Sequence, residues 1–325
     1  NETLPKGRKQ KTTALYDRFV NQGAVMGDSF GLENVLWFAN NKEDAHEEPT
    51  IKRSRSHDYV SKEVINVREN VGLIEVANFS KHEFKGPDAR KFLDHIMAGR
   101  LPKPGRISLS PMLSYRGKLC GDLTVACLDE NEFMVFGSGA AQEMHRRWFE
   151  SHLDKFNLSY SNRSDEYHGL SIAGPNSRKV LEKIVRDDVS NEKFKFRDSR
   201  RMFVGGVPAI INRISFTGEL GYEIYVAPHY QLKLYEELME AGKEFNIKPF
   251  GGRALMSMRL EKNWGAWTLD YRPDFTAKET GLDAFINWDK EFIGKESAQK
   301  ENSSNKLVPL IVETNEIDVT NNEAV

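Results

Sequence analysis

Short apolar stretches, most of them closed by a glycine turn and followed by a helical pattern, recur along most of this chain. One strand–turn–helix unit runs from Phe84 to Met97, and a second runs from Leu170 to Val185. The first turn contains Gly86-Pro87, and proline suits the first turn of a helix because its φ angle is already near the helical value. Short strands with interleaved helices are typical of the α+β class. The likeness of the two units indicates an internal duplication.

The same patterns predict most of the secondary structure between about residue 62 and residue 300. Apolar and β-branched stretches bounded by turns indicate strands, whereas apolar residues at helical spacing indicate helices. Strands are expected at the end of 64–76, within 108–127 on either side of Arg116-Gly117, and at 132–139, 169–175, 207–216 and 222–226. Helices are expected at the start of 64–76 and at 87–97, 142–156, 176–185, 230–242 and 251–261.

Composition divides the 325 residues into three parts. Residues 1–60 are polar and carry mixed charge, so we expect a linker or extension that wraps a larger body, which is formed by residues 61–300. In the last part, 301–325, Leu307–Val312 resembles a strand without a partner in the sequence. An unpaired strand tends to pair with other chains and to aggregate. The chain also does not begin with methionine. We therefore expect a longer protein in which a further β unit starts near residue 301.

Charge and hydrophobicity exclude several classes of protein. Apolar residues make up 39% of the chain and charged residues 29%, which is enough apolar material for a folded core. With 46 Lys and Arg against 48 Asp and Glu, the net charge is -2, which argues against a general nucleic-acid or membrane-surface binder. No apolar run approaches the roughly 18 residues of a membrane-spanning helix, and we do not expect the first residues to be a secretory signal, because they carry charge and no apolar segment.

The cysteine content points to a reducing compartment. Cys120 and Cys127 are seven residues apart on one predicted strand, so their Cα atoms lie roughly 23 Å apart at about 3.3 Å per residue. A disulfide requires less than about 7 Å between Cα atoms, and two cysteines alone do not make a zinc site. We expect the cytoplasm, with the mitochondrial matrix as the alternative.

Common catalytic and nucleotide-binding motifs are absent from the sequence. It contains no GxGxxG after a strand, no Walker A motif and no HExxH. The eight histidines show no metal-ligand spacing, and most stand in polar contexts. We expect solvated or capping histidines and no bound metal.

Asp122 is an acidic residue in the middle of a predicted strand. Strand alternation places it on one face with Cys120, Thr124 and Ala126, opposite a face of larger apolar residues. A carboxylate among small side chains is unusual inside a sheet. The pattern therefore indicates either a functional acid or a half-exposed edge strand.

Glu223 and Arg253 are two further candidates. Glu223 shares a strand face with Tyr225, and the glycines before it would let a ligand approach closely. Arg253 follows Gly251-Gly252 at a helix start, where the helix dipole disfavours a cation. We expect its side chain to reach across to a partner group, although an exposed salt-bridged face would explain it equally well.

Several segments resemble, in the same order along the chain, the sequence patterns of one enzyme family. They are 121–125 (GDLTV, similar to DDLIV), 214–224 (ISFTGELGYEI, similar to YTGE.G.E), 250–262 (FGGRALMSMRLEK, similar to G..ARDSLRLE) and 292–296 (FIGKE). The family is that of the folate-dependent aminomethyltransferases, the T-proteins of the glycine cleavage system. Segment 24–39 also resembles GAVFGE.FGWERPNWFA, which joins the flavin half to the folate half of dimethylglycine and sarcosine dehydrogenases.

The resemblance implies a multi-lobed ring with tetrahydrofolate in a central channel and an incomplete C-terminal β-barrel. It implies that Glu223 pairs with the pterin, since one carboxylate can accept hydrogen bonds from a ring N–H and the 2-amino group. It also implies that Asp122 is the catalytic residue, near the folate nitrogens that capture the one-carbon unit. There it can take a proton or stabilise a developing cation.

Other folate-site positions follow from the same resemblance. Arg253 matches an arginine of the site, and Trp288 matches an aromatic wall residue. Ser138 stands where relatives often carry asparagine. Phe216 replaces a tyrosine and Gly121 replaces the first aspartate of the family pattern, so the chain departs from its relatives at these two positions.

The resulting hypothesis is tetrahydrofolate-dependent capture of a methyl-derived carbon from a methylated amine of the dimethylglycine or sarcosine type, as 5,10-methylene-tetrahydrofolate. FAD would then belong to a missing domain or a partner flavoprotein chain, and neither nucleic acid nor membrane is an expected partner. Two alternatives remain: a stand-alone T-protein-like transferase and a non-catalytic folate-binding module.

Overall fold

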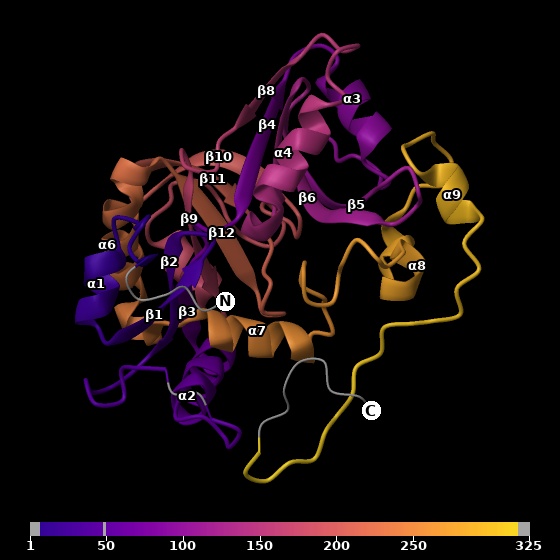
Figure 1. The fold of residues 1–325 in the computed structure, drawn as a ribbon. Coiled ribbons are helices and arrows are strands. Elements are labelled where there is room, and N and C mark those ends of the chain that lie inside the picture. Colours follow the sequence, from indigo (N-terminus) through magenta and orange to yellow (C-terminus); the bar gives the residue numbers. More distant parts are fainter. Residues whose placement is uncertain (1–6, 48–49, 318–325) are drawn as a thin grey trace.

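Two β-sheets, one hairpin and the helices that cover them make up the molecule (Figure 1). The structure is a computed structural model that describes residues 7–47 and 50–317. Within these ranges, no helix is both long and apolar enough to cross a membrane. The α+β class predicted from the alternation of strands and helices is confirmed.

The larger sheet has six strands in the order β10-β11-β12-β9-β3-β13. All neighbouring strands are antiparallel except β13 and β3, which are parallel. The bounds are β3 (Val71–Glu75), β9 (His168–Ala173), β10 (Ser199–Val204), β11 (Val207–Asn212), β12 (Gly221–Val226) and β13 (Ile247–Pro249).

The smaller sheet has five antiparallel strands in the order β5-β6-β7-β4-β8. The bounds are β4 (Ser80–Lys85), β5 (Arg106–Leu113), β6 (Leu119–Asp129), β7 (Glu132–Gly137) and β8 (Ser159–Asn162). A separate hairpin pairs β1 (Ala24–Ser29) with β2 (Leu32–Phe38).

Helices cover the outer faces of both sheets (Figure 1). The α-helices are α1 (Tyr16–Asn21), α2 (Ser56–Glu69), α3 (Ala89–Ile96), α4 (Gln142–Glu150), α5 (Ser177–Glu182), α6 (Gln231–Gly242), α7 (Gly252–Glu261), α8 (Ala277–Thr280) and α9 (Lys295–Gln299). Helices α1, α5 and α6 pack on the six-stranded sheet, and α3 and α4 pack on the five-stranded sheet.

The inner faces of the two sheets meet in a core that also includes α7. Phe136 of β7, Ala126 of β6 and Tyr225 of β12 belong to this inter-sheet core, as do Ala254 and Met258 of α7. Strand alternation therefore directs every second residue of β6 and β12 into the space between the sheets. This space holds the candidate functional site.

The N-terminal region is integrated into the cores of the molecule. Leu15 and Phe19 are buried in the same core as β3 and β9, and Trp37 anchors a smaller cluster with Val25 and Ala39. Glu63 of α2 joins this region to the main body because its carboxylate accepts hydrogen bonds from the backbone N–H groups of Phe38 (2.7 Å) and Gly251 (2.9 Å). The region thus contributes directly to the folded body.

We expect Glu63→Ala to lower the free energy of unfolding by about 2–4 kcal/mol, because it leaves two backbone donors without their acceptor. Chemical denaturation of the variant and the unmodified chain measures the difference. Glu69→Ala, at an exposed position near the end of the same helix, is the control and should change the value by about 0.5 kcal/mol or less. Equal stability of the two variants would contradict the linking role of Glu63.

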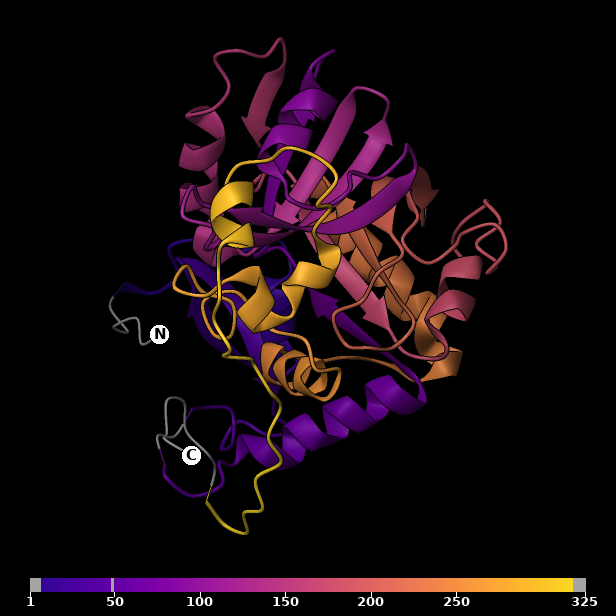
Figure 2. The same ribbon diagram turned by 90° about the vertical axis from the view of Figure 1, so that its right-hand side faces the viewer.

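The C-terminal residues from 301 onward form no regular strand within the part of the chain that the structure describes. The segment predicted as a strand, Leu307–Val312, is extended and exposed and has no ladder, because no neighbouring strand offers backbone partners. Its backbone contacts are single ones, such as the N–H of Leu307 to the carbonyl of Glu279 (2.7 Å). Figure 2 shows this segment, in yellow, running along the outside of the molecule. The strand prediction is wrong here, and residues 318–325 lie outside the described residues.

Candidate functional site

A row of buried polar side chains crosses the inner face of the six-stranded sheet. Its members lie opposite one another on adjacent strands. They are Ser199 (2% exposed), Asn212 (0%), Glu223 (6%) and Ser171 (6%). The next residue in the row is the apolar Ile74 of β3. Polar side chains are mostly exposed, and buried ones normally have hydrogen-bond partners. A row of four buried polar side chains therefore marks a candidate binding site.

The amide of Asn212 has an unsatisfied donor next to Glu223. Ser199 Oγ donates a hydrogen bond to Asn212 Oδ1 at 2.7 Å. The other amide atom, Nδ2, is buried and has no hydrogen-bond partner among the described residues. A buried donor without an acceptor is costly. The row therefore presents a carboxylate acceptor and a free amide donor on neighbouring strands.

Tyr225 fixes the orientation of Glu223. Its hydroxyl donates to Glu223 Oε2 at 2.8 Å, and its ring stacks on Phe136 of the opposite sheet with 4.6 Å between ring centroids. Both residues of β12 face the inter-sheet space, as the sequence alternation predicts. The tyrosine thus holds the carboxylate in place and joins the two sheets.

Two lysines influence the charge of Glu223. Burial raises the pKa of Glu223 to about 7, while the hydrogen bond from Tyr225 and the positive charges of Lys262 and Lys81 act in the opposite direction. Lys81 is itself fully buried, and burial lowers its pKa to about 7. Its Nζ donates to the carbonyl of Ala77 at 2.7 Å. A carboxyl with this pKa changes its charge near neutral pH.

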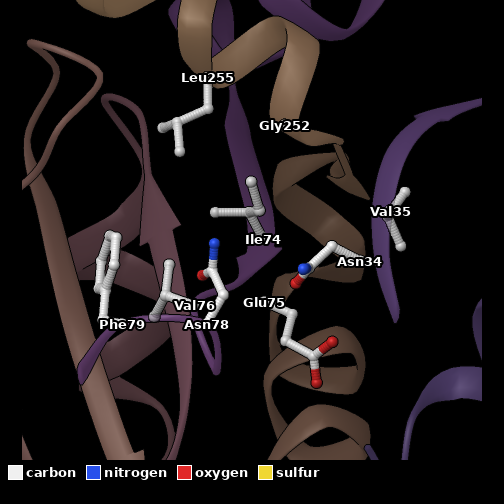
Figure 3. A pocket seen from close by; sticks show the side chains of 9 residues that line it. All are labelled: Asn34, Val35, Ile74, Glu75, Val76, Asn78, Phe79, Gly252 and Leu255. Atoms are coloured by element: carbon white, nitrogen blue, oxygen red, sulfur yellow. The ribbon is translucent and has the colours of Figure 1, made fainter. Parts of the chain in front are cut away.

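A small, mostly apolar cavity of about 60 Å³ lies beside the polar row. Ile74, Val76, Phe79 and Leu255 direct their side chains toward it (Figure 3). Because Ile74 lies two strands from Glu223 in the same row, the cavity begins roughly 10 Å from the carboxylate at about 4.8 Å per strand. Its complete lining is Asn34, Val35, Ile74, Glu75, Val76, Asn78, Phe79, Gly252 and Leu255.

Asp122 faces the same space from the five-stranded sheet. Leu123 and Val125 point into the outer core under α3 and α4, whereas Ala126 points into the inter-sheet core, so Asp122 and Thr124 lie on the inner side. Burial raises the pKa of the half-buried Asp122 to about 7. A carboxyl with this pKa can both give and take a proton at neutral pH.

The predicted face of Asp122 requires one correction. A bulge in the β5–β6 ladder leaves Cys120 as an extra residue, because Leu113 pairs with Leu119 and Met112 pairs with Gly121. Cys120 consequently packs against the outer core and does not share the inner face with Asp122. Both cysteines are free.

The other expected site residues occupy different surroundings. Ser138 follows β7, and the β6–β7 register, continued by two residues beyond Thr124–Phe136, places it opposite Asp122. Phe216 is half-buried in the loop that leads to β12. Trp288 is 37% exposed and lies between α8 and α9, and the centroids of its ring and of the Phe292 ring are 5.9 Å apart.

The side chain of Arg253 binds to residues of the N-terminal region. Its guanidinium pairs with Glu47 and donates to Ser56 Oγ, so the expected partner across from the helix start is a segment of this chain. When the family pattern G..ARDSLRLE is aligned on the shared Arg259, its first arginine falls on Leu255. Leu255 lines the cavity, so this chain has an apolar side chain where the pattern has its first arginine.

Several residues of the site were not among the candidates from the sequence. They are Asn212, Tyr225, Lys81, Lys262 and Tyr271. Tyr225 could have been found, since it lies two residues after Glu223 on the same strand face. Tyr271 belongs to the loop after α7, where the Asp122 charge contributes to its raised pKa of about 12, although burial is the larger cause. No sequence pattern connects this loop with Asp122.

The comparisons with known proteins agree with this architecture. The model of the GCVT N-terminal domain matches residues 15–290. The chain belongs to this family. The glycine cleavage system aminomethyltransferase T from Bartonella henselae superposes with a TM-score of 0.75 at 22% identity, covering 90% of this chain and 74% of that one. The predicted aminomethyltransferase-like α+β fold is thereby confirmed.

Two kinds of GCVT-family relatives share sequence along nearly the whole chain. The mitochondrial dimethylglycine dehydrogenase of Mus musculus is 34% identical in an alignment 324 residues long, which covers 97% of this chain but only 37% of the mouse protein. An aminomethyltransferase of Desulfitobacterium hafniense (strain Y51) is 29% identical over 306 residues, covering 92% of this chain and 78% of the bacterial one. The chain therefore spans little more than a third of the length of the dehydrogenase.

Proposed function

We propose that this GCVT-family chain binds tetrahydrofolate between its two sheets and promotes the capture of a one-carbon unit as 5,10-methylene-tetrahydrofolate. The observation that carries the proposal is the buried polar row, in which Glu223 stands beside the unsatisfied Asn212 Nδ2 and faces the strand of Asp122. No ordinary core requires such a row. A planar ligand with adjacent donors and an acceptor would satisfy both groups at once.

The residues present fit a reduced folate. Glu223 supplies an acceptor for the pterin ring N–H and 2-amino groups, and Asn212 Nδ2 supplies a donor for a ring oxygen or nitrogen. The apolar side chains of Ile74, Phe79 and Leu255 line the neighbouring cavity and would pack on the ring system. In this proposal Arg253 secures the N-terminal region, while Phe216, Ser138 and Trp288 line the approach to the bound molecule.

The reacting end of the ligand would lie toward Asp122. When bound, tetrahydrofolate supplies two nitrogens that together capture carbon at the oxidation level of formaldehyde. Asp122 would first give a proton to the oxygen that leaves as water and would then take the N–H proton that the second nitrogen gives up. Because its pKa of about 7 is close to neutral pH, one carboxyl can serve as the acid for the departing oxygen and then as the base for the N–H proton, and it ends the cycle in its starting state. In this proposal Ser138, opposite Asp122 in the extended register, orients the carboxyl.

The proposed source of the carbon is a methyl group of a methylated amine such as dimethylglycine or sarcosine. The 34% identity with a dimethylglycine dehydrogenase over 97% of the chain supports this substrate class. Oxidation of the amine would take place on a flavoprotein domain or partner chain. Because the mouse relative is mitochondrial, we favour the mitochondrial matrix over the cytoplasm as the location of this chain.

Calorimetric titration with 5-formyl-tetrahydrofolate, a stable reduced folate, tests the binding half of the proposal. A second assay tests the chemistry: the rate at which the chain forms 5,10-methylene-tetrahydrofolate from tetrahydrofolate and formaldehyde, above the uncatalysed rate, coupled to an NADP-dependent dehydrogenase. Saturable binding together with acceleration is the expected result. Binding without acceleration would instead support a non-catalytic folate-binding module, and absence of binding would overturn the proposal.

A stand-alone aminomethyltransferase is the second candidate function. It is favoured by the 29% identity to a bacterial aminomethyltransferase of which the alignment covers 78%. Transfer from a carrier-bound aminomethyl group without any flavoprotein would support this candidate. Transfer that depends on an added amine-oxidising flavoprotein would support the dehydrogenase assignment.

Folate affinity should depend on pH through Glu223. Its pKa is raised to about 7, and only the ionised carboxylate accepts hydrogen bonds at both oxygens. We therefore expect the affinity for 5-formyl-tetrahydrofolate to fall about tenfold for each pH unit below about 7, measured by calorimetry between pH 5.5 and 8. A flat profile would contradict the role of Glu223 as the acceptor.

Lys81→Met should shift the midpoint of this affinity profile to a higher pH. The positive charge of Lys81 lowers the pKa of Glu223, so its removal raises that pKa and shifts the midpoint of the affinity profile by about 0.5–1 pH unit. Lys85→Met is the control, since Lys85 lies on the same strand but pairs with Glu83 and Glu132 at 2.8 and 2.9 Å. The same titrations measure both variants, and equal midpoints would refute the coupling.

A further inference from the structure

Three polar side chains lie buried on the outer side of the five-stranded sheet, away from the folate site proposed above. Ser80 and His82 project from β4 and His145 projects from α4, and their exposed fractions are 0%, 0% and 1%. The expectation that the histidines are solvated or capping is wrong for these two. Burial lowers the pKa of His82 to about 3 and that of His145 to about 4, so both rings are neutral at physiological pH.

The single hydrogen bond of the His145 ring determines its tautomer. Its Nε2 lies 2.9 Å from the carbonyl oxygen of Cys120. A carbonyl only accepts, so Nε2 carries the hydrogen and Nδ1 is unprotonated. Among the described residues His145 Nδ1, His82 Nε2 and Ser80 Oγ have no hydrogen-bond partner. The ring is thus held by this single bond and by its packing.

The hydrogen bond from His145 is accepted by the backbone of the bulge that precedes Asp122. Cys120 is the extra residue of that bulge, and Gly121 separates it from Asp122. A Cβ atom on Gly121 would lie 2.8 Å from His145 Nε2, so the imidazole occupies the place where a side chain would be. This contact accounts for the glycine at a position where the family pattern has an aspartate.

His145 also touches the loop on the other side of Asp122. Its ring centroid lies 6.1 Å from that of Trp267, which belongs to the same core cluster as Tyr271. The charge of Asp122 acts on Tyr271, which places the two side chains near each other. The histidine therefore contacts two of the segments that surround the carboxyl.

We propose that His145 is a positioning residue for Asp122: its ring, anchored to the Cys120 carbonyl and packed over Gly121, fixes the bulge that directs the Asp122 carboxyl into the inter-sheet space. The proposal rests on the proposed function, because it assigns a task to Asp122. His145 itself faces the outer core and touches no ligand.

The test compares variants in the coupled formation assay with the 325-residue chain. His145→Leu removes the donor and should lower kcat about ten- to hundredfold, as expected for a small misplacement of a reacting group, with KM for tetrahydrofolate unchanged within about twofold. His145→Gln carries an amide N–H at the position of Nε2 and should restore most of kcat. Phe149→Leu, in the same helix and the same core, controls for general loosening and should leave kcat within about twofold.

Gly121→Ala gives an independent test that does not depend on the folding of His145→Leu. The added methyl group pushes against His145 Nε2, and kcat should fall while KM remains unchanged. The proposal is overturned if His145→Leu and Phe149→Leu lose activity alike, if KM rises together with the fall of kcat, or if Gly121→Ala has normal kcat. If the unmodified chain fails to bind 5-formyl-tetrahydrofolate, the proposed function fails on its own, before any variant is compared.

Discussion

Asp122→Asn is expected to slow the formation of 5,10-methylene-tetrahydrofolate by two or more orders of magnitude, since general acid–base catalysis contributes typically about 10²–10⁴-fold. The amide has nearly the same size as the carboxyl but can neither take nor return the proton. The effect should fall on kcat, whereas the affinity for 5-formyl-tetrahydrofolate should change by less than about threefold, because the proposed pterin acceptor is Glu223 on the other sheet. The coupled assay and calorimetry measure the two quantities separately.

Asp129→Asn provides the control for this prediction. Asp129 is the exposed last residue of the same strand, and its replacement should leave both kcat and affinity unchanged. A normal rate for Asp122→Asn would remove Asp122 from the mechanism. A loss of affinity equal to the loss of rate would instead make it a binding residue.

The side-chain alternation of β12 was predictable from the sequence. In β12, Tyr222, Ile224 and Val226 enter one core while Glu223 and Tyr225 face the other side. Period-two alternation depends only on backbone geometry, so it needs no knowledge of partners. What the alternation alone could not show, and only the family resemblance implied, is that Asp122 and Glu223 face one common space. The two strands belong to different sheets, and their approach depends on contacts between residues distant in the chain.

Strand β4 is the element that sequence reasoning largely missed. Its sequence, Ser-Lys-His-Glu-Phe-Lys, is polar, yet the first five residues are all buried. Polar composition ordinarily indicates an exposed loop. Here one face of the strand presents Lys81 toward Glu223, and the opposite face presents Ser80 and His82 toward His145. A local departure from the hydrophobic pattern thus coincides with the proposed functional regions on both faces of the strand.

Arg253 shows a different limit of sequence reasoning. The helix start and its glycines were recognisable, and helix α7 is present as predicted. The direction of a long side chain, however, depends on what lies opposite, and Glu47 is 206 positions away in the sequence. The apolar Leu255 lines the cavity without any charge that would draw attention to it.

Glu223→Gln should weaken the binding of 5-formyl-tetrahydrofolate about ten- to hundredfold at pH 8, where the unmodified carboxyl is ionised. A hydrogen bond to a charged group contributes about 1.5–3 kcal/mol, and each 1.4 kcal/mol corresponds to a factor of ten in affinity. The amide keeps one oxygen, which the Tyr225 hydroxyl already occupies. Its NH₂ group would then face the donors of the pterin, so the loss combines a missing acceptor with a donor facing donors.

A stability measurement separates this loss of binding from damage to the fold. The pKa of Glu223 is raised in the folded protein, so the folded state holds the proton more tightly than the unfolded state. The unmodified chain therefore loses stability as pH rises from about 4.5 to about 7. The Gln variant has no such titration and should be at least as stable as the unmodified chain at pH 8 while binding folate more weakly. Tyr225→Phe keeps the stacking on Phe136 and should reduce affinity by less than Glu223→Gln. Unchanged affinity for Glu223→Gln, or weak affinity accompanied by an equal loss of stability, would exclude Glu223 as the pterin acceptor.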